Sequence, residues 1–102
     1  MNDFDFHFEW DSTKAAINSV QHGVDFKSAL SVLRDPLAIT IFDDDHSTAD
    51  ETRWITIGKA SGGAYLVVVH TWEDIGPNAA KIRIISARNA TRYERRIYKE
   101  EQ

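Results

Sequence analysis

Residues 64–72 read AYLVVVHTW and form the most apolar run of the chain. A short run rich in β-branched residues is typical of a buried strand, so this segment is predicted to be the central strand of a sheet. It follows SGG at 61–63, which is typical of a hairpin turn, and the alternating segment TRWITIGKA at 52–60. The sheet is therefore expected to be built around a hairpin.

The N-terminal part of the chain predicts a strand and a helix. Aromatic residues alternate with polar ones over residues 4–10, which indicates a half-buried strand. Asp11 or Ser12 can cap a helix that ends near His22, where Gly23 supplies the left-handed closing residue. The apolar face of this helix is expected to consist of Ala16, Ile17 and Val20.

A second helix is expected directly afterwards. Asp25 is its candidate cap, and apolar residues then recur at helical spacing until Pro36 stops the helix at about Arg34. LAITIF at 37–42 is a candidate strand, and the acidic run DDDHSTADE at 43–51 is typical of an exposed loop.

The C-terminal part predicts a loop, a strand and a helix. Residues 73–79 (EDIGPNA) are predicted to form a loop around Gly76 and Pro77. Residues 81–86 (KIRIIS) are the last expected strand. Thr91 and Glu94 form a T-x-x-E capping box, which starts a helix near residue 91. Its apolar stripe is expected to contain Tyr93 and Ile97.

The predicted element order is β-α-α-β-β-β-β-α. Two helices followed by hairpin-connected strands indicate an α+β fold with a mostly antiparallel sheet of four to five strands. The length of 102 residues suits a single domain, 1–102. Without cysteine the chain has no disulfide and no thiolate metal site, which favours a cytoplasmic protein. Neither a signal peptide nor an apolar run long enough for a membrane span is expected.

Charge is distributed unevenly along the chain. The net charge is −4, yet residues 81–99 hold seven basic residues and one acidic residue, whereas residues 1–80 hold five basic and thirteen acidic residues. A basic segment can bind phosphates locally on an otherwise acidic molecule. It can equally be a solvated helix face.

Several motifs in fixed order carry a family resemblance. They are FEWD…K (8–14), N…HGVDF (18–26), DP (35–36), the DHS loop with E-x-R (44–53), ITIG (55–58), LVVVHT (66–71) and RIISAR-x-AT…E…Y (83–98). This combination resembles the BrnT family of type II toxin–antitoxin toxins. Two features depart from the family pattern, namely Gln21, where Lys is usual before His-Gly, and the net negative charge.

The resemblance implies a fold similar to the RelE-type ribonuclease toxins and inhibition of translation by RNA cleavage. It also implies a BrnA-like antitoxin with a ribbon-helix-helix part, and operator DNA bound only through the toxin–antitoxin complex. Homo- or hetero-oligomers are open alternatives. No cofactor and no membrane partner are implied.

Metal-independent RNA cleavage requires a base, an acid and cations that stabilise the phosphorane. His70, near the end of the most apolar strand, is a candidate acid or base, or else a half-buried histidine bonded to a carbonyl. Arg83 is a charge inside an apolar strand, which is costly unless it is paired or functional. Arg88 is a second candidate phosphate ligand, or else a salt-bridge partner of the acidic loop.

The acidic loop offers further candidates. Glu51 and Arg53 are two residues apart; Glu51 is a candidate general base, and both are also candidates for simple ion pairs. His46 is an exposed candidate for proton transfer. The run DDDH lacks the ligand spacing of a metal loop, and no metal is expected.

Other residues are candidates for binding RNA or a protein partner. They are Lys14, Lys81, Arg92, Arg95, Arg96 and Lys99. Trp54, Tyr65 and Trp72 can stack on bases or pack in the core.

The sequence leaves three functions open. The first is an endoribonuclease toxin in which Arg83 and Arg88 hold the phosphate while His70, with Glu51 or His46, moves protons. The second is a non-catalytic binding module of the same family, and the third is a small metal-dependent protein built on DDDH.

Overall fold

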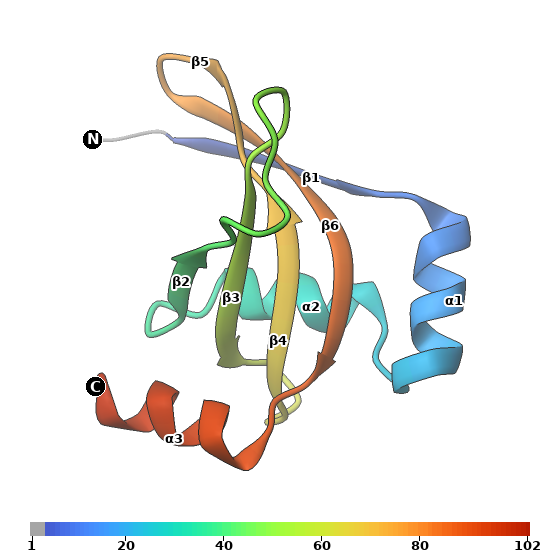
Figure 1. Cartoon of the computed structure of the whole chain (residues 1–102), viewed down its shortest axis with the longest axis vertical. Coiled ribbons are helices and arrows are strands. Elements are labelled where there is room, and N and C mark those ends of the chain that lie inside the picture. The colour runs from blue at the N-terminus through green and yellow to red at the C-terminus, as the bar shows by residue number, and fades with distance from the viewer. Residues whose placement is uncertain (1–3) are drawn as a thin grey trace.

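The predicted central strand lies in the middle of a six-stranded sheet (Figure 1). The structure is a computed structural model that describes residues 4–102. The strands lie in the order β1-β6-β4-β3-β2, and β5 pairs with β6 outside this path. The elements are β1 (Asp5–Trp10), α1 (Ser12–His22), α2 (Phe26–Leu33), β2 (Ile39–Phe42), β3 (Arg53–Lys59), β4 (Tyr65–Thr71), β5 (Glu73–Gly76), β6 (Ala79–Asn89) and α3 (Arg92–Glu100).

The α+β fold with a mostly antiparallel sheet is confirmed, since among the strand pairs of residues 4–102 only β1–β6 is parallel. The sheet has one more strand than expected. Residues 73–76, predicted as loop, form β5, and β6 is longer than the predicted strand 81–86. The reason is that β5 and the start of β6 form a hairpin around Pro77 and Asn78. All of β5 is exposed, so it needs no apolar pattern.

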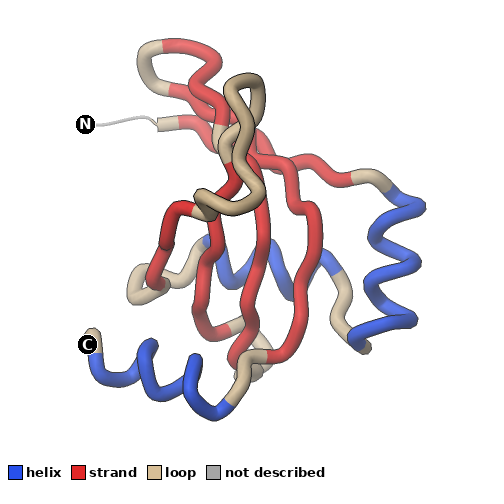
Figure 2. Tube along the Cα trace, viewed as in Figure 1, coloured by secondary structure: helices blue, strands red, loops and turns tan. Residues whose placement is uncertain are grey.

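The sheet has two faces with separate cores. On the first, which we call the α2 face, Leu66, Val68 and Ile84 pack against Phe26, Ala29 and Val32. On the second, which we call the α3 face, Ile57 and Val67 pack with Ala90 and Tyr98. Each helix covers only part of its face, and the end of the sheet near β5 and the loop between β2 and β3 carries no helix (Figures 1 and 2).

The helix ends agree with the prediction. Asp11 caps α1 by accepting hydrogen bonds from two backbone N–H groups, and Gly23 adopts φ 66° at its other end. Asp25 caps α2, and the Thr91–Glu94 capping box is complete. Over residues 4–102, no helix has the length and apolar character needed to cross a membrane.

The predicted apolar face of α1 is wrong. Ile17 is 50% exposed and Val20 is 87% exposed, whereas Asn18 is buried. The Asn18 side-chain amide donates to the carbonyls of Val24 (3.0 Å) and Ala87 (2.8 Å), and its oxygen accepts from the Ala87 N–H (3.0 Å). A polar anchor therefore attaches α1 to β6 and leaves Ile17 and Val20 outside the core.

The predicted stripe on α3 is also incomplete. Tyr93 is 69% exposed, and Tyr98 is the buried residue of this helix. Its hydroxyl donates to Asp35 (2.7 Å), which also accepts from the backbone N–H groups of Leu37 and Lys59. Burial opposes ionisation of Asp35, but these hydrogen bonds outweigh it and lower its pKa, while the pKa of Tyr98 rises to about 12. Asp35 thus joins α2, β3 and α3.

Candidate phosphodiester site

A cluster of charged side chains lies on the α3 face, at the end of the sheet away from α3. Arg83 Nη2 contacts Glu51 Oε2 at 2.6 Å, and Arg53 Nε contacts Glu51 Oε1 at 2.9 Å. The three side chains remain between 32% and 39% exposed. One carboxylate therefore bridges two arginines in a position that solvent and ligands can reach.

Backbone pairing places the two arginines side by side. Arg53 on β3 is in register with Thr71 on β4, and the Thr71 hydroxyl accepts from the Arg83 N–H on β6 (3.0 Å). Glu51 is positioned by a turn in which its N–H donates to the Thr48 hydroxyl (3.1 Å). The sequence thus brings a loop carboxylate against two neighbouring strands.

The two arginines keep Glu51 ionised. The hydrogen bond from Arg83, followed by that from Arg53, lowers the pKa of Glu51, and slight burial opposes this only weakly. Because two guanidinium groups share one carboxylate, the cluster keeps a net positive charge. Carboxylate and phosphate pair with arginine in the same way, so the contacts that Glu51 makes are of a kind that a phosphate also makes.

A cleft of about 290 Å³ adjoins the cluster and is lined by two of its members, Glu51 and Arg83. Lys81 lines it and contacts Glu73 (Nζ–Oε1 3.4 Å), and Trp72 forms part of its wall. The remaining lining residues are Glu9, Ala49, Asp50, Glu51, Thr52, Thr71, Glu73 and Arg83.

His7 is a neighbour of this cleft that the sequence reasoning did not single out. β1 runs parallel to β6, with His7 in register with Lys81 and Glu9 with Arg83. Paired residues of neighbouring strands face the same side, so His7 belongs to the α3 face, and it is exposed. The alternation of residues 4–10 already placed it opposite the aromatic side chains.

His70 lies on the other face of the sheet from Arg83. It pairs with Ile84 of the α2 face and is 3% exposed, so the structure does not bring His70 and Arg83 into one site. Its Nε2 is 2.7 Å from the Thr56 hydroxyl, and its Nδ1 is 3.0 Å from the Thr71 carbonyl. The alternative of a histidine bonded to a neighbouring carbonyl describes this geometry. Burial lowers the pKa of His70, so the neutral imidazole is favoured.

Arg88 is on the same face as Arg83 but is five residues further along β6, about 16 Å away. It forms a bidentate pair with Glu94, with Nη–Oε distances of 2.7 and 2.8 Å. This pair holds the pKa of Glu94 at about 2. The partner of Arg88 is therefore the first turn of α3 rather than the acidic loop.

The acidic loop holds His46 away from the cluster. His46 Nδ1 is 3.0 Å from Asp43 Oδ2, and its side chain is 68% exposed. Nothing in the structure joins His46 to Glu51 or Arg83. Among residues 4–102, no group of three or more His, Asp or Glu side chains is arranged to hold a metal ion.

The predicted binding residues fall into three places. Lys14 is exposed on α1, which lies well apart from α3 (Figure 1), and Lys81 lines the cleft. On α3, Arg92 and Arg96 are exposed, whereas Arg95 Nη1 donates to the Ala90 carbonyl (3.3 Å). Lys99 is also exposed and lies over the Tyr65 ring, 5.4 Å from its centroid.

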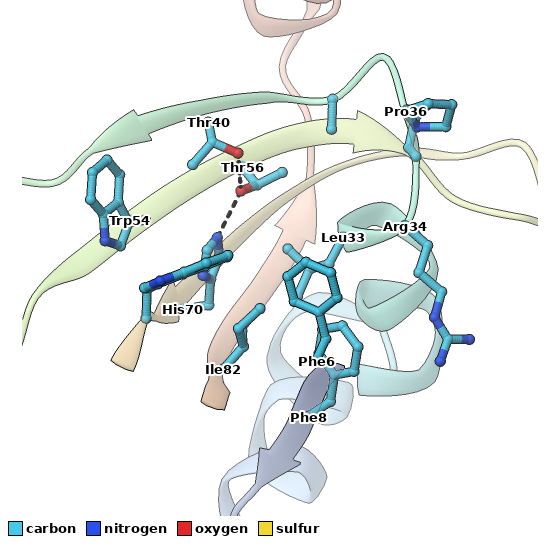
Figure 3. A pocket seen from close by; sticks show the side chains of 13 residues that line it. Phe6, Phe8, Leu33, Arg34, Pro36, Thr40, Trp54, Thr56, His70 and Ile82 are labelled. Carbon is cyan, nitrogen blue, oxygen red and sulfur yellow. Dashed lines mark hydrogen bonds between the residues drawn. The ribbon is translucent and has the colours of Figure 1, made fainter. Parts of the chain in front are cut away.

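A second cavity opens on the α2 face beside the end of α2 (Figure 3). It has a volume of about 790 Å³ and holds the candidate stacking residues Trp54 and Trp72. Trp54 is half-buried, packs edge-on against Phe42, and its buried Nε1 has no hydrogen-bond partner within residues 4–102. Tyr65 instead packs against Tyr98 in the α3-face core.

The chain is a small α+β protein whose open sheet face presents two arginines, a carboxylate and a nearby histidine, residue types that serve in phosphodiester chemistry. The sequence comparison gives this class a family. The model of the ribonuclease toxin BrnT of type II toxin–antitoxin systems matches residues 10–94, and the chain belongs to this family. A toxin of such a system has an antitoxin partner.

A solved structure supports the same assignment. The crystal structure of the Brucella abortus ribonuclease toxin BrnT at 1.1 Å resolution superposes with a TM-score of 0.57. The two chains are 26% identical, and the match covers 86% of this chain and 99% of that one. No curated protein matches the chain in sequence.

Proposed function

We propose that the chain is a metal-independent endoribonuclease toxin that cuts RNA at the Glu51–Arg53–Arg83 cluster. The observation that carries the proposal is the single carboxylate shared by two partly exposed arginines. A phosphate that binds both arginines displaces the Glu51 carboxylate from them. Glu51 then lies next to the scissile phosphate and its ribose. Catalysis by positioned charge and by proton transfer then requires no metal.

The reaction follows from these positions. Arg83 and Arg53 bind the non-bridging oxygens of the scissile phosphate and stabilise the charge that develops on them. The ribose 2′-oxygen attacks phosphorus while Glu51 takes the 2′-hydroxyl proton. The bond from phosphorus to the 5′-oxygen breaks, and the leaving oxygen takes a proton from His7. The products are a 2′,3′-cyclic phosphate and a 5′-hydroxyl.

Other predicted residues receive different roles in this proposal. Arg88 and Glu94 fix the junction between β6 and α3, and the exposed cations of α3 bind the RNA backbone or the antitoxin. His70 shapes the opposite face. We propose a BrnA-like ribbon-helix-helix antitoxin that neutralises the toxin and carries the complex to operator DNA, and a cytoplasmic site of action in which cleavage stops translation.

The test uses purified protein freed of antitoxin and a labelled RNA in the presence of EDTA. Cleavage is expected, with cyclic phosphate ends, and a 2′-deoxy substitution at the cut position blocks it. Arg83→Ala is expected to lower kcat/KM by about 10²–10³, the effect of losing one donor to a developing oxyanion. Lys27→Ala removes an exposed cation from α2 and is the control. Equal cleavage by Arg83→Ala would contradict the site.

A second candidate function is a non-catalytic binding module. Glu51 occupies both arginines in the unliganded chain, and Gln21 stands exposed where lysine is usual in the family. In that case the protein binds RNA or the antitoxin without cutting. Binding of the labelled RNA with no cleavage, at any protein concentration, would favour this function.

A further inference from the structure

The cavity on the α2 face has flat aromatic walls and an open mouth. Phe6, Phe8, Trp54 and Trp72 line it, and Phe6 and Trp72 are 48% and 37% exposed. Phe6 meets Trp72 edge-on, with centroids 5.7 Å apart. The Trp72 ring is fixed because its Nε1 donates to Asp74 (3.0 Å). Exposed aromatic faces that are held in place suit a planar ligand, because binding then costs little free energy for rearranging the side chains.

A chain of hydrogen bonds leads from the floor of this cavity to its open side (Figure 3). His70 Nδ1 faces the Thr71 carbonyl, so it carries the proton, and Nε2 accepts from the Thr56 hydroxyl. The Thr56 oxygen then accepts from the Thr40 hydroxyl, 2.9 Å away. The exposed Thr40 therefore offers its oxygen as an acceptor at the cavity.

Trp72 separates the cavity from the cleft beside the arginine cluster. Trp72 lines both the α2-face cavity and the α3-face cleft that contains Arg83 and Glu51. β3 begins at Arg53, in register with Thr71, so the β3–β4 pairing ends one residue before Trp72 and Trp72 lies at the edge between the two faces. A polymer chain bound by its phosphate at the cluster can pass around Trp72 from one face to the other.

We propose that the α2-face cavity binds a nucleobase of the RNA whose phosphate is held at the arginine cluster, and so sets the sequence preference of cleavage. The inference rests on the proposed function and adds that the protein recognises the identity of one base of its RNA substrate. The base stacks on Trp72 and Phe6, and an N–H on its edge donates to Thr40.

The composition of the cavity favours a base over an apolar side chain of a protein partner. Arg34 lies at its margin, and an acceptor, Thr40, faces its interior. A base edge carries both donors and acceptors, and its faces match the aromatic walls.

The experiment measures whether the contribution of one RNA base to Kd depends on the Trp72 side chain. The probe is an RNA hexamer with 2′-O-methyl riboses, which cannot be cleaved, together with versions in which one base at a time is removed. In the native protein, removal of the base at one position is expected to raise Kd roughly tenfold to a hundredfold, the usual effect of losing one stacked base. In Trp72→Ala the same removal is expected to change Kd less than twofold.

Two further variants complete the set. Thr40→Val, which keeps the side-chain shape at an exposed position, is expected to weaken binding of the intact hexamer and not of the abasic one. Ile17→Ala removes an exposed apolar side chain from α1 and is expected to behave as the native protein in every measurement. Circular dichroism checks that each variant is folded.

Each outcome decides the proposal. Abasic effects of equal size in the native protein and in Trp72→Ala overturn it. Unchanged RNA binding by Trp72→Ala, with loss of neutralisation by the antitoxin, overturns it in favour of a protein occupant. Absence of RNA cleavage by the native protein contradicts the proposed function alone. The Kd values of the intact and abasic uncleavable hexamers still test the cavity. Where cleavage occurs, Trp72→Ala is expected to cut with a broader base preference.

Discussion

Strand β6 carries two arginines that each pair with a glutamate from another part of the chain, and the surroundings of the two pairs differ. Arg88 and Glu94 form two hydrogen bonds with each other, and Glu94 Oε1 also accepts from the Thr91 N–H (2.8 Å). The Glu94 side chain is only 19% exposed. Arg83 instead shares Glu51 with Arg53, and the Glu51 side chain is 32% exposed.

The difference separates a structural pair from the proposed binding site. At Arg88 the charges balance one to one, and the carboxylate is committed to the helix cap as well. At Arg83 one carboxylate serves two guanidinium groups, so a cation remains for an anionic ligand. A charged residue in a strand is therefore informative about function only when its partners are known, and the sequence does not supply them.

The largest expected effect distinguishes the two glutamates by activity. Glu51→Gln removes the proposed base and is expected to lower kcat by about 10²–10⁴, the range for general base catalysis. RNA is expected to bind more tightly to this variant, because the arginines lose their competing carboxylate. Single-turnover cleavage and a Kd for uncleavable RNA measure the two effects.

Glu94→Gln is the matched control for that prediction. It keeps a side chain that can complete the capping box, and kcat per folded molecule is expected to stay within a few-fold of the native value. If both glutamine variants lose activity to the same degree, the distinction between the pairs is wrong.

The second effect distinguishes the arginines by stability. Arg88→Ala leaves Glu94 with one partner fewer and is expected to lower the free energy of unfolding by about 2 kcal/mol, or Tm by roughly 10 °C. Arg83→Ala removes a contact to Glu51, which is more exposed than Glu94 and keeps Arg53 as a partner, and is expected to cost less than about 1 kcal/mol. Urea unfolding of both variants gives the comparison, and a reversed order would contradict it.

The third effect is the dependence of stability on pH. The folded pKa of Glu94 is about 2, below its ordinary value of 4.5, so its contribution is complete above pH 4.5 and is lost as pH falls toward 2. Because Arg88 is partly exposed, we expect this loss to be about 1–2 kcal/mol. Unfolding by urea at several pH values measures it, and Glu94→Gln should flatten the profile between pH 4.5 and 2. An unchanged slope would contradict the assignment.

Local features of the fold were predictable because their partners lie within a few residues. Asp11, Gly23 and the Thr91–Glu94 box follow from capping, which depends on neighbouring backbone groups. The apolar segment 64–72 was correctly placed at the centre, since a strand covered on both faces needs apolar residues on both.

Features that depend on distant partners were not predictable. Asn18 replaces the expected apolar face of α1 because its partner Ala87 is 69 residues away. The relative faces of His70 and Arg83 depend on a register shift between Val69 and His70 in the β4–β6 pair, which alternation within one strand cannot reveal. His7 could have been found, because its place opposite the aromatic residues was already visible.

The smallest expected effect concerns cations of α3 that, unlike Arg83 and Arg88, form no salt bridge with a glutamate. Arg92 and Arg96 are exposed on α3, and no carboxylate within residues 4–102 forms a salt bridge with either of them. If they bind RNA phosphates, each alanine variant should raise KM a few-fold, leave kcat unchanged and reduce the salt slope of binding by about one. Arg95, which already donates to Ala90, should matter less. A fall in kcat would instead place α3 at the reacting phosphate, and the separation between RNA binding by α3 and catalysis at the arginine cluster would be wrong. Cleavage rates and Kd values across a salt series therefore show whether Arg92 and Arg96 act in binding or in catalysis.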